Sequence, residues 1–398
     1  MLRVKATVSI APATSKSIQI HHKKVEDDGD NLHVRDVVCF SPNLAQNYGE
    51  STEIAGTDRY SRMAFASGNK ESPCLGVKVT EGLGNLPKVV LTSPGRKPHT
   101  LGMPECASDK SCLVNLTNKG PRGGACLPIA TFFPPSLVAL KVHSLVPCEA
   151  ELYLFGACIT SWKVGNKDLL FVRPDAVFNG QKPISGGIPH CFPQFGPGQI
   201  QQHGFARNVD WSLVNSENVE GNPVITVELK DGPYSRSMWD YSFQALYKVT
   251  LDEKTLSTEF RVTNTDQKPF SFTTALHTYF RGSIGSVSVR GLKGCKTLNK
   301  HPDPKNPVEG NEERDVVTFP GFVDCVYLDT PNELQLDNGL GDTISIKNTN
   351  WSDAVLWNPH LTMEACYKDF VCVENAKIGQ VELEPNQSWT AVQHLSIP

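Results

Sequence analysis

The segment LSTEFRVTN at 256–264 decides the fold, because its apolar and polar residues alternate with a period of two. Successive side chains of a strand point to opposite faces, so this alternation predicts a strand with one buried face. The same pattern recurs, between turn residues, at 224–231, 286–292, 333–338, 343–349 and 381–385. No stretch of about 12 residues carries a convincing helical apolar stripe. We therefore expect an all-β chain whose region from 149 to 398 forms a large antiparallel β-sandwich.

The part of the chain before this region has three segments of different character. Residues 1–72 show no sustained helix or strand period, and their first 24 residues carry basic side chains but no acid. We interpret them as a flexible leader, with a composition that also fits a transit segment. Residues 75–93 predict a hairpin, because two β-prone runs flank a turn rich in Gly and Asn. Residues 94–148 are rich in Pro and Cys, and a structureless loop of this length is rare inside a compact domain. The predicted sandwich thus spans 75–398 and is interrupted by an insertion at 94–148.

The composition argues against several classes of protein. Of the 398 residues, 39% are hydrophobic and 20% are charged, and the formal net charge is −4. These values disfavour a disordered chain and a basic nucleic-acid binder. No apolar run reaches the roughly 18 residues of a membrane-spanning helix, so no membrane partner is expected. The 12 cysteines include no CxxC pair, and neither HExxH nor GxSxG occurs, which disfavours a zinc ribbon, a metalloprotease and a serine hydrolase. We expect buried free thiols.

The first candidate for chemistry is His277, in the run FSFTTALHTYF at 270–280. The strand period places Ser271, Thr273 and Ala275 on the same face as His277, ahead of it in the run. These small or hydroxylic neighbours leave space in front of the imidazole, which suits a ligand cleft. Imidazole donates or accepts a proton near neutral pH. The alternative is a structural histidine with no part in chemistry.

The second candidate is Glu374, in the run FVCVEN at 370–375. The same period puts Glu374 on one face with Phe370 and Cys372, an unusually apolar setting for a carboxylate. Burial there would raise its pKa and make it a stronger base. The alternative is a glutamate at a strand end that faces water.

Two adjoining segments, GGIPHCFPQFGPG at 186–198 and QQHGFARN at 201–208, are too rich in Gly and Pro for a helix or a long central strand. We expect an ordered loop that presents aromatic and basic side chains. The guanidinium of Arg207 offers a planar fork for hydroxyl, carboxylate or phosphate groups. The Trp of WNP at 357–359 could stack on a sugar or fill the core. The side chains expected on the loop are Phe192, Phe195, His203 and Arg207.

Six motifs, in this order and spacing, resemble the aldose 1-epimerase superfamily, and within it the hexose-6-phosphate mutarotases in the form found in plants. The motifs are GGIPHCFPQFGP, QHGFAR, LHTYF, GFVDCVYL, WSDAVLWNP and FVCVENA. The resemblance covers 149–396 and the hairpin at 75–93. It implies a galactose mutarotase-like β-sandwich and an isomerase that interconverts the α and β anomers of a hexose 6-phosphate, with glucose 6-phosphate as the expected substrate. It also implies chemistry without cofactor or metal, and we expect a monomer.

The resemblance implies a role for each matched residue. His277 would be the general acid that protonates the ring oxygen, and Glu374 the general base that takes the proton of the anomeric hydroxyl. The ring opens, the aldehyde rotates, and the two residues exchange roles as the ring closes on its other face. The implied substrate-binding residues are Gln202, His203, Arg207 and Asp324.

Ser185 departs from the resemblance, because the sugar-phosphate members carry Arg immediately before GGIP. The change removes a bidentate phosphate contact, although Arg207 remains and Lys182 or Arg173 could compensate. The alternatives are therefore a free aldose, another phosphosugar, or a sugar-binding sandwich without turnover. The presence of both the acid and the base favours the enzyme.

The insertion at 94–148 is also foreign to the resemblance. Members of the family join a strand like LTSP to a strand like EAELYLFG through only a few residues. We therefore interpret the insertion as a translated intron, with a genuine lineage-specific loop as the alternative. The plant-like form and the acid-free leader favour the chloroplast, with the cytoplasm as the other location considered.

Overall fold

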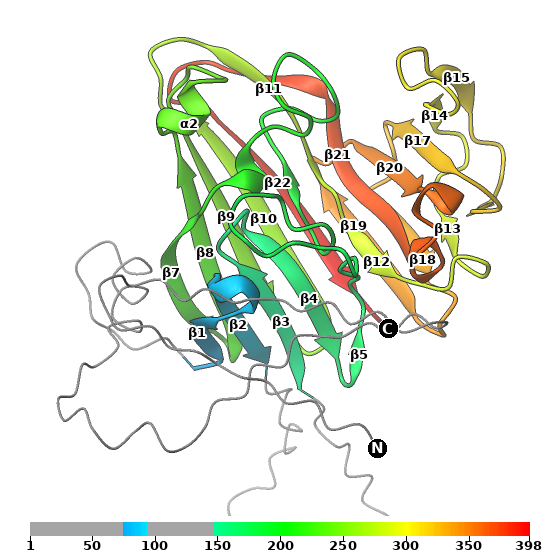
Figure 1. Cartoon of the computed structure of the whole chain (residues 1–398), viewed down its shortest axis with the longest axis horizontal. Helices are drawn as coiled ribbons and strands as arrows, with labels where there is room; N and C mark the ends of the chain where they lie inside the picture. The colour runs from blue at the N-terminus through cyan, green and yellow to red at the C-terminus, as the bar shows by residue number, and fades with distance from the viewer. Residues whose placement is uncertain (1–74, 94–146) are drawn as a thin grey trace, which may run out of the picture. The chain divides into compact units, whose positions relative to one another are not determined.

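The computed structural model describes residues 75–93 and 147–398, which form three sheets with very little helix (Figure 1). The first sheet has five strands in the order β1-β2-β3-β4-β5. Their bounds are β1 (Val77–Glu81), β2 (Pro87–Ser93), β3 (Cys148–Tyr153), β4 (Cys158–Val164) and β5 (Lys167–Asp168).

The second sheet has nine strands in the order β16-β13-β18-β19-β22-β10-β9-β8-β7. Their bounds are β7 (Ser212–Val219), β8 (Asn222–Lys230), β9 (Phe243–Leu251), β10 (Thr255–Asn264), β13 (Ser288–Arg290), β16 (Val316–Thr318), β18 (Glu333–Asp337), β19 (Thr343–Thr349) and β22 (Ser388–Ser396).

The third sheet has eight strands in the order β15-β14-β17-β20-β21-β11-β6, with β12 paired to β21 off this path. Their bounds are β6 (His190–Cys191), β11 (Phe270–Leu276), β12 (Tyr279–Arg281), β14 (Lys296–Asn299), β15 (Val308–Asn311), β17 (Val323–Leu328), β20 (Asp353–Asn358) and β21 (Phe370–Leu383). Within 75–93 and 147–398, the helices are one α-helical turn, α2 (Pro233–Arg236), and the 3-10 turns η2 (Leu83–Asn85), η3 (Ala206–Asn208), η4 (His360–Met363) and η5 (Tyr367–Asp369).

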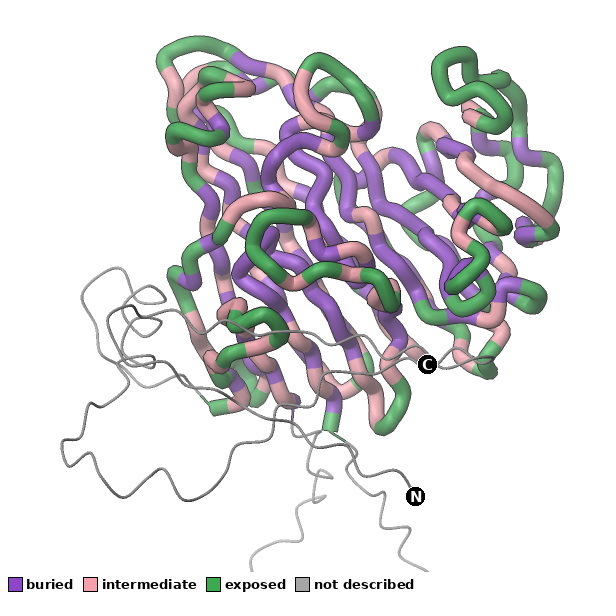
Figure 2. Tube along the Cα trace, viewed as in Figure 1, coloured by how far each residue is buried: buried purple, intermediate pink, exposed green. Residues whose placement is uncertain are grey.

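The predicted all-β antiparallel fold is confirmed, because the strands pair antiparallel throughout the three sheets. Strand β10 shows why, since its even-numbered residues from Leu256 to Val262 are buried while the residues between them are at least partly exposed. The main apolar core contains such side chains from all three sheets, so the sheets pack face to face. Figure 2 shows the buried positions running along the strands and the exposed ones gathered at the loops.

One strand predicted from the sequence needs correction. The segment 381–385 is not a strand of its own, because it continues FVCVEN within the 14-residue strand β21. The register between β11 and β21 shifts between Phe272 and Thr274, so β21 contains extra residues around Gly379 that hide its continuity in the sequence.

Within the residues that the structure describes, no helix is long and apolar enough to cross a membrane.

The hairpin predicted at 75–93 forms as β1 and β2, and the insertion begins directly after it. Cys148, assigned to the insertion from sequence, is instead the first residue of β3 and pairs with Ser93 at the end of β2. The described cysteines, seven with Cys148 included, are free and buried, as expected. The predicted leader at 1–72 and the rest of the insertion lie outside the described residues.

Candidate active site

The two candidates for acid–base chemistry, His277 and Glu374, meet across neighbouring strands. Leu276 at the end of β11 pairs with Asn375 of β21, and the next step of that register places His277 opposite Glu374. The His277 Nε2 atom lies 3.4 Å from Glu374 Oε1. Two motifs that are separated by nearly 100 residues in the sequence therefore form one pair.

The GGIP motif holds the backbone of His277 in place. The His277 backbone N–H donates a hydrogen bond to the Pro189 carbonyl at 3.0 Å. Gly187 has a φ of +68°, and a Cβ atom built on it would lie 2.1 Å from the Ile159 carbonyl oxygen. Only glycine fits this approach of the loop to strand β4, which explains why the motif requires it.

Burial controls the protonation of the pair. Glu374 is 2% exposed, and desolvation raises the pKa of its carboxyl well above the ordinary value, opposed mainly by the charge of Lys300. Desolvation also lowers the pKa of His277 well below its ordinary value, and His203 and Arg207 add to this shift. Burial alone thus favours a neutral pair, with the proton on Glu374 and an uncharged imidazole. A cation close to Glu374, or a ligand, is needed to favour the charged pair.

Each member of the pair also has an atom ready for a ligand. Among the described residues, His277 Nδ1, Glu374 Oε2 and Arg207 Nε are buried without a hydrogen-bond partner. Leaving a buried polar atom unpaired costs about 1–3 kcal/mol. Such atoms persist where a bound molecule supplies the missing bonds.

Two of the loop residues, His203 and Arg207, lie near His277, and Gln202 contacts both of them from an exposed position. The rings of His203 and His277 are 5.6 Å apart at a steep angle. His203 Nδ1 accepts a hydrogen bond from the Gly196 N–H at 3.2 Å, and burial lowers the pKa of His203 to about 3. His203 is therefore neutral, with its proton on Nε2, which lies 3.4 Å from the Gln202 side-chain nitrogen. Arg207 donates to the Gln202 carbonyl at 2.9 Å.

Asp324 reaches the same region from strand β17, and it brings a residue that the sequence did not single out. The Lys300 ammonium lies 3.7 Å from Asp324 Oδ1 and 4.8 Å from the centre of the Phe195 ring. Phe195 is fixed in turn, because its N–H donates to the Thr273 hydroxyl at 2.8 Å. Lys300 follows the short strand β14 in a segment without a motif, so only the pairing of β14 with β17 reveals its position.

The aromatic residues around His277 differ in part from the expectation. The Tyr279 ring, which strand alternation places on the same face as His277, stacks on the imidazole with 4.8 Å between ring centres and 12° between ring planes. Trp357 meets the edge of His277 at 5.8 Å, so it belongs to the site. Phe192, expected on the loop, is fully buried in the main core.

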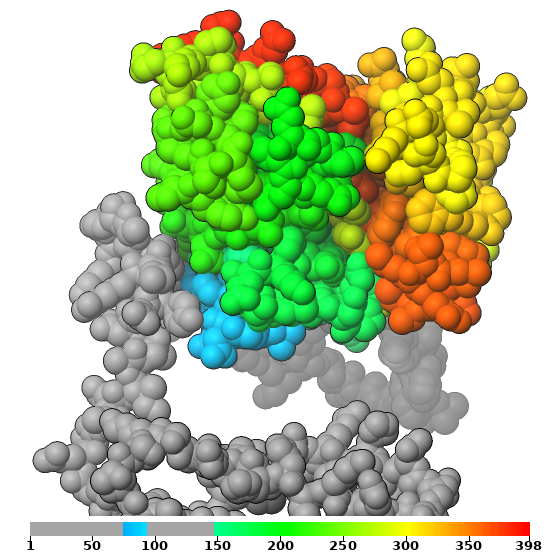
Figure 3. All heavy atoms as spheres, turned by 45° about the horizontal axis from the view of Figure 1, so that its top comes forward, coloured from blue at the N-terminus to red at the C-terminus, as the bar shows by residue number. Residues whose placement is uncertain are grey.

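A pocket of ≈ 360 Å³ adjoins His277. Arg207, Lys182 and Ser185 contribute to its lining, so it contains cationic groups beside the imidazole. Arg173, the other cation considered from sequence, forms an ion pair with Asp175, with contacts of 2.5 and 2.9 Å. Figure 3 shows the green surface of residues near 200 facing the yellow surface of residues near 300, with redder C-terminal residues between them.

Three donor groups in this corner could hold a metal ion, because ligand atoms of His277, Cys372 and Glu374 lie within 4.8 Å of one another. Burial raises the pKa of both the Cys372 thiol and the Glu374 carboxyl. A metal would have to displace both protons to bind there. The geometry therefore fits a pair for proton transfer better than a metal centre.

Comparisons with known proteins identify the family of the chain. The family model for aldose 1-epimerase matches residues 146–396. A Cenchrus ciliaris protein named "Putative glucose-6-phosphate 1-epimerase" is 34% identical over 276 residues, which cover 64% of this chain and 83% of the relative. The solved structure of a "putative mutarotase" from Salmonella typhimurium is 30% identical with a TM-score of 0.57, covering 63% of this chain and 87% of that one. A galactose mutarotase-like protein from Clostridium acetobutylicum, 14% identical with a TM-score of 0.57 over 81% of this chain and 98% of its own, shares the fold. The chain therefore belongs to the aldose 1-epimerase family and is an isomerase of the epimerase, or mutarotase, type.

Proposed function

We propose that the protein interconverts the α and β anomers of a hexose 6-phosphate, with glucose 6-phosphate as the substrate. The observation that carries the proposal is the contact of 3.4 Å between His277 and Glu374, since ring opening requires one proton donor and one acceptor. The name of the Cenchrus ciliaris relative supports the choice of sugar.

The proposed reaction starts from the charged pair, which the bound ligand and the nearby cations favour: ionised Glu374 removes the proton of the anomeric hydroxyl while protonated His277 protonates the ring oxygen. The bond between the anomeric carbon and the ring oxygen breaks, and an open-chain aldehyde forms. Rotation of the aldehyde exposes its other face to the ring hydroxyl, after which His277 takes back its proton and Glu374 returns the other. Each proton-transfer role contributes about 10²–10⁴-fold to the rate.

The neighbouring residues fit the remaining parts of such a substrate. We assign Asp324 and Gln202 to sugar hydroxyls, and His203, neutral by its lowered pKa, to a further hydrogen bond with the sugar. Arg207 and Lys182 line the pocket beside His277 and supply positive charge for a phosphate. Lys182 then substitutes for the guanidinium that Ser185 lacks.

Exchange NMR of the two anomers tests the proposal, with glucose 6-phosphate and glucose measured in parallel. The wild type should accelerate exchange of the phosphorylated sugar much more than that of glucose. His277→Ala and Glu374→Gln should each reduce the acceleration by about 10²–10⁴-fold. If the purified wild type binds the sugar phosphate without accelerating anomer exchange, the protein is a sugar-binding protein and the proposed catalysis is wrong.

A free aldose is the second candidate, and Ser185 is the observation that favours it. A serine in the pocket provides no bidentate phosphate contact. Equal acceleration for glucose and glucose 6-phosphate would support this alternative.

We also propose that the function resides in residues 75–93 and 147–398, and that the insertion is a translated intron. Ser93 and Cys148, which flank it, are direct partners across β2 and β3, so a tight turn could join the two strands. A spliced transcript without the segment would agree with this proposal. Peptides from residues 100–145 in the native protein would contradict it.

A further inference from the structure

Lys300 links two parts of the site that the proposed mechanism treats separately. Its backbone N–H donates to the Asp324 carbonyl at 2.8 Å, and its ammonium lies 3.7 Å from the carboxylate of the same residue. The ammonium also lies 4.8 Å from the centre of the Phe195 ring, whose edge contacts His203 at 5.4 Å between ring centres. Lys300 therefore connects strand β17 with the loop that carries His203.

The ammonium is placed where two acidic groups need a counter-charge. Asp324 raises the pKa of Glu374, because two like charges close together disfavour ionisation of both. Lys300 opposes this effect at Glu374 and also at Asp324, where burial raises the pKa of the carboxyl. The side chains of Lys300 and Asp324 are only 21% and 25% exposed, so solvent screens this interaction incompletely.

We propose that Lys300 is a positioning residue that holds the Asp324 carboxylate and the Phe195 ring at the substrate-binding face and balances the negative charge of Asp324 and Glu374. The inference rests on the proposed function, since it assigns Lys300 to the proton transfer proposed there. Lys300 acts through Glu374 and Asp324 and need not touch the reacting atoms.

Other groups also face Glu374, and they define what the test must separate. They come from the chain segments around β6, β11, β12, η3 and β17, and from β21 itself. Arg207 is the second cation, so removal of Lys300 should weaken the ionised state of Glu374 without abolishing it. The titratable groups facing Glu374 besides Lys300 are Cys191, Arg207, His277, Tyr279, Asp324 and Cys372.

The test compares Lys300→Met and Lys300→Arg with the wild type. Loss of the charge should raise the pKa of the Glu374 carboxyl by about one unit or more, measured by ¹³C NMR titration of the full chain. The acid limb of the pH–rate profile for anomer exchange should move upward by the same amount. At a pH on that limb, kcat/KM should fall about tenfold, and Lys300→Arg should recover most of it.

Lys293→Met is the matched control, because Lys293 pairs with Asp315 at 2.9 Å on the exposed surface. This variant should leave both the titration and the profile unchanged. If Lys300→Met fails to fold, Lys300→Gln replaces it and keeps a polar group at a partly exposed position. If a folded Lys300→Met or Lys300→Gln protein shows the same titration of the Glu374 carboxyl as the wild type, the proposal is wrong. If the wild type does not accelerate anomer exchange, the proposed function is wrong. The NMR titration would still decide the role of Lys300.

Discussion

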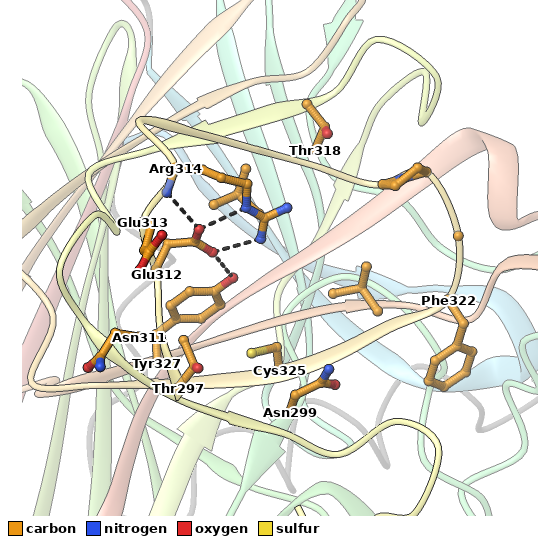
Figure 4. Close-up of a pocket in the computed structure, with 14 residues that line it drawn as sticks. Thr297, Asn299, Asn311, Glu312, Glu313, Arg314, Thr318, Phe322, Cys325 and Tyr327 are labelled. Carbon is orange, nitrogen blue, oxygen red and sulfur yellow. Dashed lines mark hydrogen bonds and ion pairs between the residues drawn. The ribbon is translucent and has the colours of Figure 1, made fainter. Parts of the chain in front are cut away.

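Glu374 and Glu312 are both buried glutamates, only 2% and 5% exposed, yet their surroundings are opposite. Glu312 accepts hydrogen bonds from Arg314 at 2.7, 2.8 and 3.0 Å and from the Tyr327 hydroxyl at 3.0 Å (Figure 4). These partners lower the pKa of Glu312 to about 2, whereas burial raises the pKa of Glu374 well above its ordinary value. The comparison teaches that burial alone does not identify a reactive carboxylate, because the hydrogen-bond partners decide its protonation.

Glu312 lines the larger of the two pockets compared, with a volume of ≈ 630 Å³ against ≈ 360 Å³ beside His277. Strand β17 separates this larger pocket from the candidate active site. Val323 and Cys325 line the larger pocket, while Asp324 between them points to the opposite face of the strand. The size of a cavity therefore says less about chemistry than whether its charged groups already satisfy one another.

The largest expected effect separates the two glutamates by function. Glu374→Gln should reduce anomer exchange by about 10²–10⁴-fold with little loss of stability, because it removes a carboxylate that is costly to bury. Glu312→Gln should leave the exchange rate within about twofold and destabilise the fold by about 1.5–3 kcal/mol, because it breaks charged hydrogen bonds. Exchange NMR and urea unfolding of both variants measure the two effects. A folded but inactive Glu312→Gln protein would break the comparison.

The difference between the surroundings of Glu374 and Glu312 could be predicted from the sequence only in part. Strand alternation in FVCVEN placed Glu374 in an apolar face, and alternation around LHTYF placed His277 beside small residues. Both indications are local, and the structure brings the two side chains to 3.4 Å. Nothing local distinguished Glu312, whose partner Tyr327 lies 15 residues away on another strand. The main partner, Arg314, is only two residues away, but a local pattern does not show that its side chain turns back onto the Glu312 carboxylate rather than into solvent.

A middle-sized effect concerns the pH dependence of stability. The pKa of Glu312 is lowered from 4.5, so its stabilising contribution is present above pH 4.5 and is lost as the pH falls towards 2. The pKa of Glu374 is raised, so its contribution is present at acid pH and is lost as the pH rises above 4.5. The stability difference between wild type and Glu312→Gln should thus shrink on acidification. The difference between wild type and Glu374→Gln should shift in the opposite direction, towards a more stable variant at high pH.

Urea unfolding of the three proteins from pH 3 to pH 8 measures these slopes. Glutamine does not titrate, so each variant serves as the reference for its own position. Slopes of the same sign for both variants would contradict the opposite surroundings of the two glutamates.

Lys300 and Cys148 show where sequence analysis failed for a similar reason. Lys300 follows a four-residue strand in a segment rich in Pro and Asn, so no period or motif marked it. Cys148 was assigned to the insertion because the composition changes gradually there, whereas its pairing with Ser93 places it in β3. In both cases the position is set by a partner strand rather than by the residues beside it.

The smallest expected effect tests whether the partners of Glu312 act together. Tyr327→Phe removes one neutral donor at 3.0 Å and keeps the aromatic ring, so it should cost only about 0.5–1.5 kcal/mol and leave anomer exchange unchanged. In the Glu312→Gln background the same change should cost less, because the charged acceptor is already gone and the two substitutions share one interaction. Urea unfolding of the four proteins in this double-mutant cycle measures the coupling. Additive costs would show that the Tyr327 hydroxyl stabilises the fold independently of Glu312, and the low pKa of Glu312 would then depend on Arg314 alone.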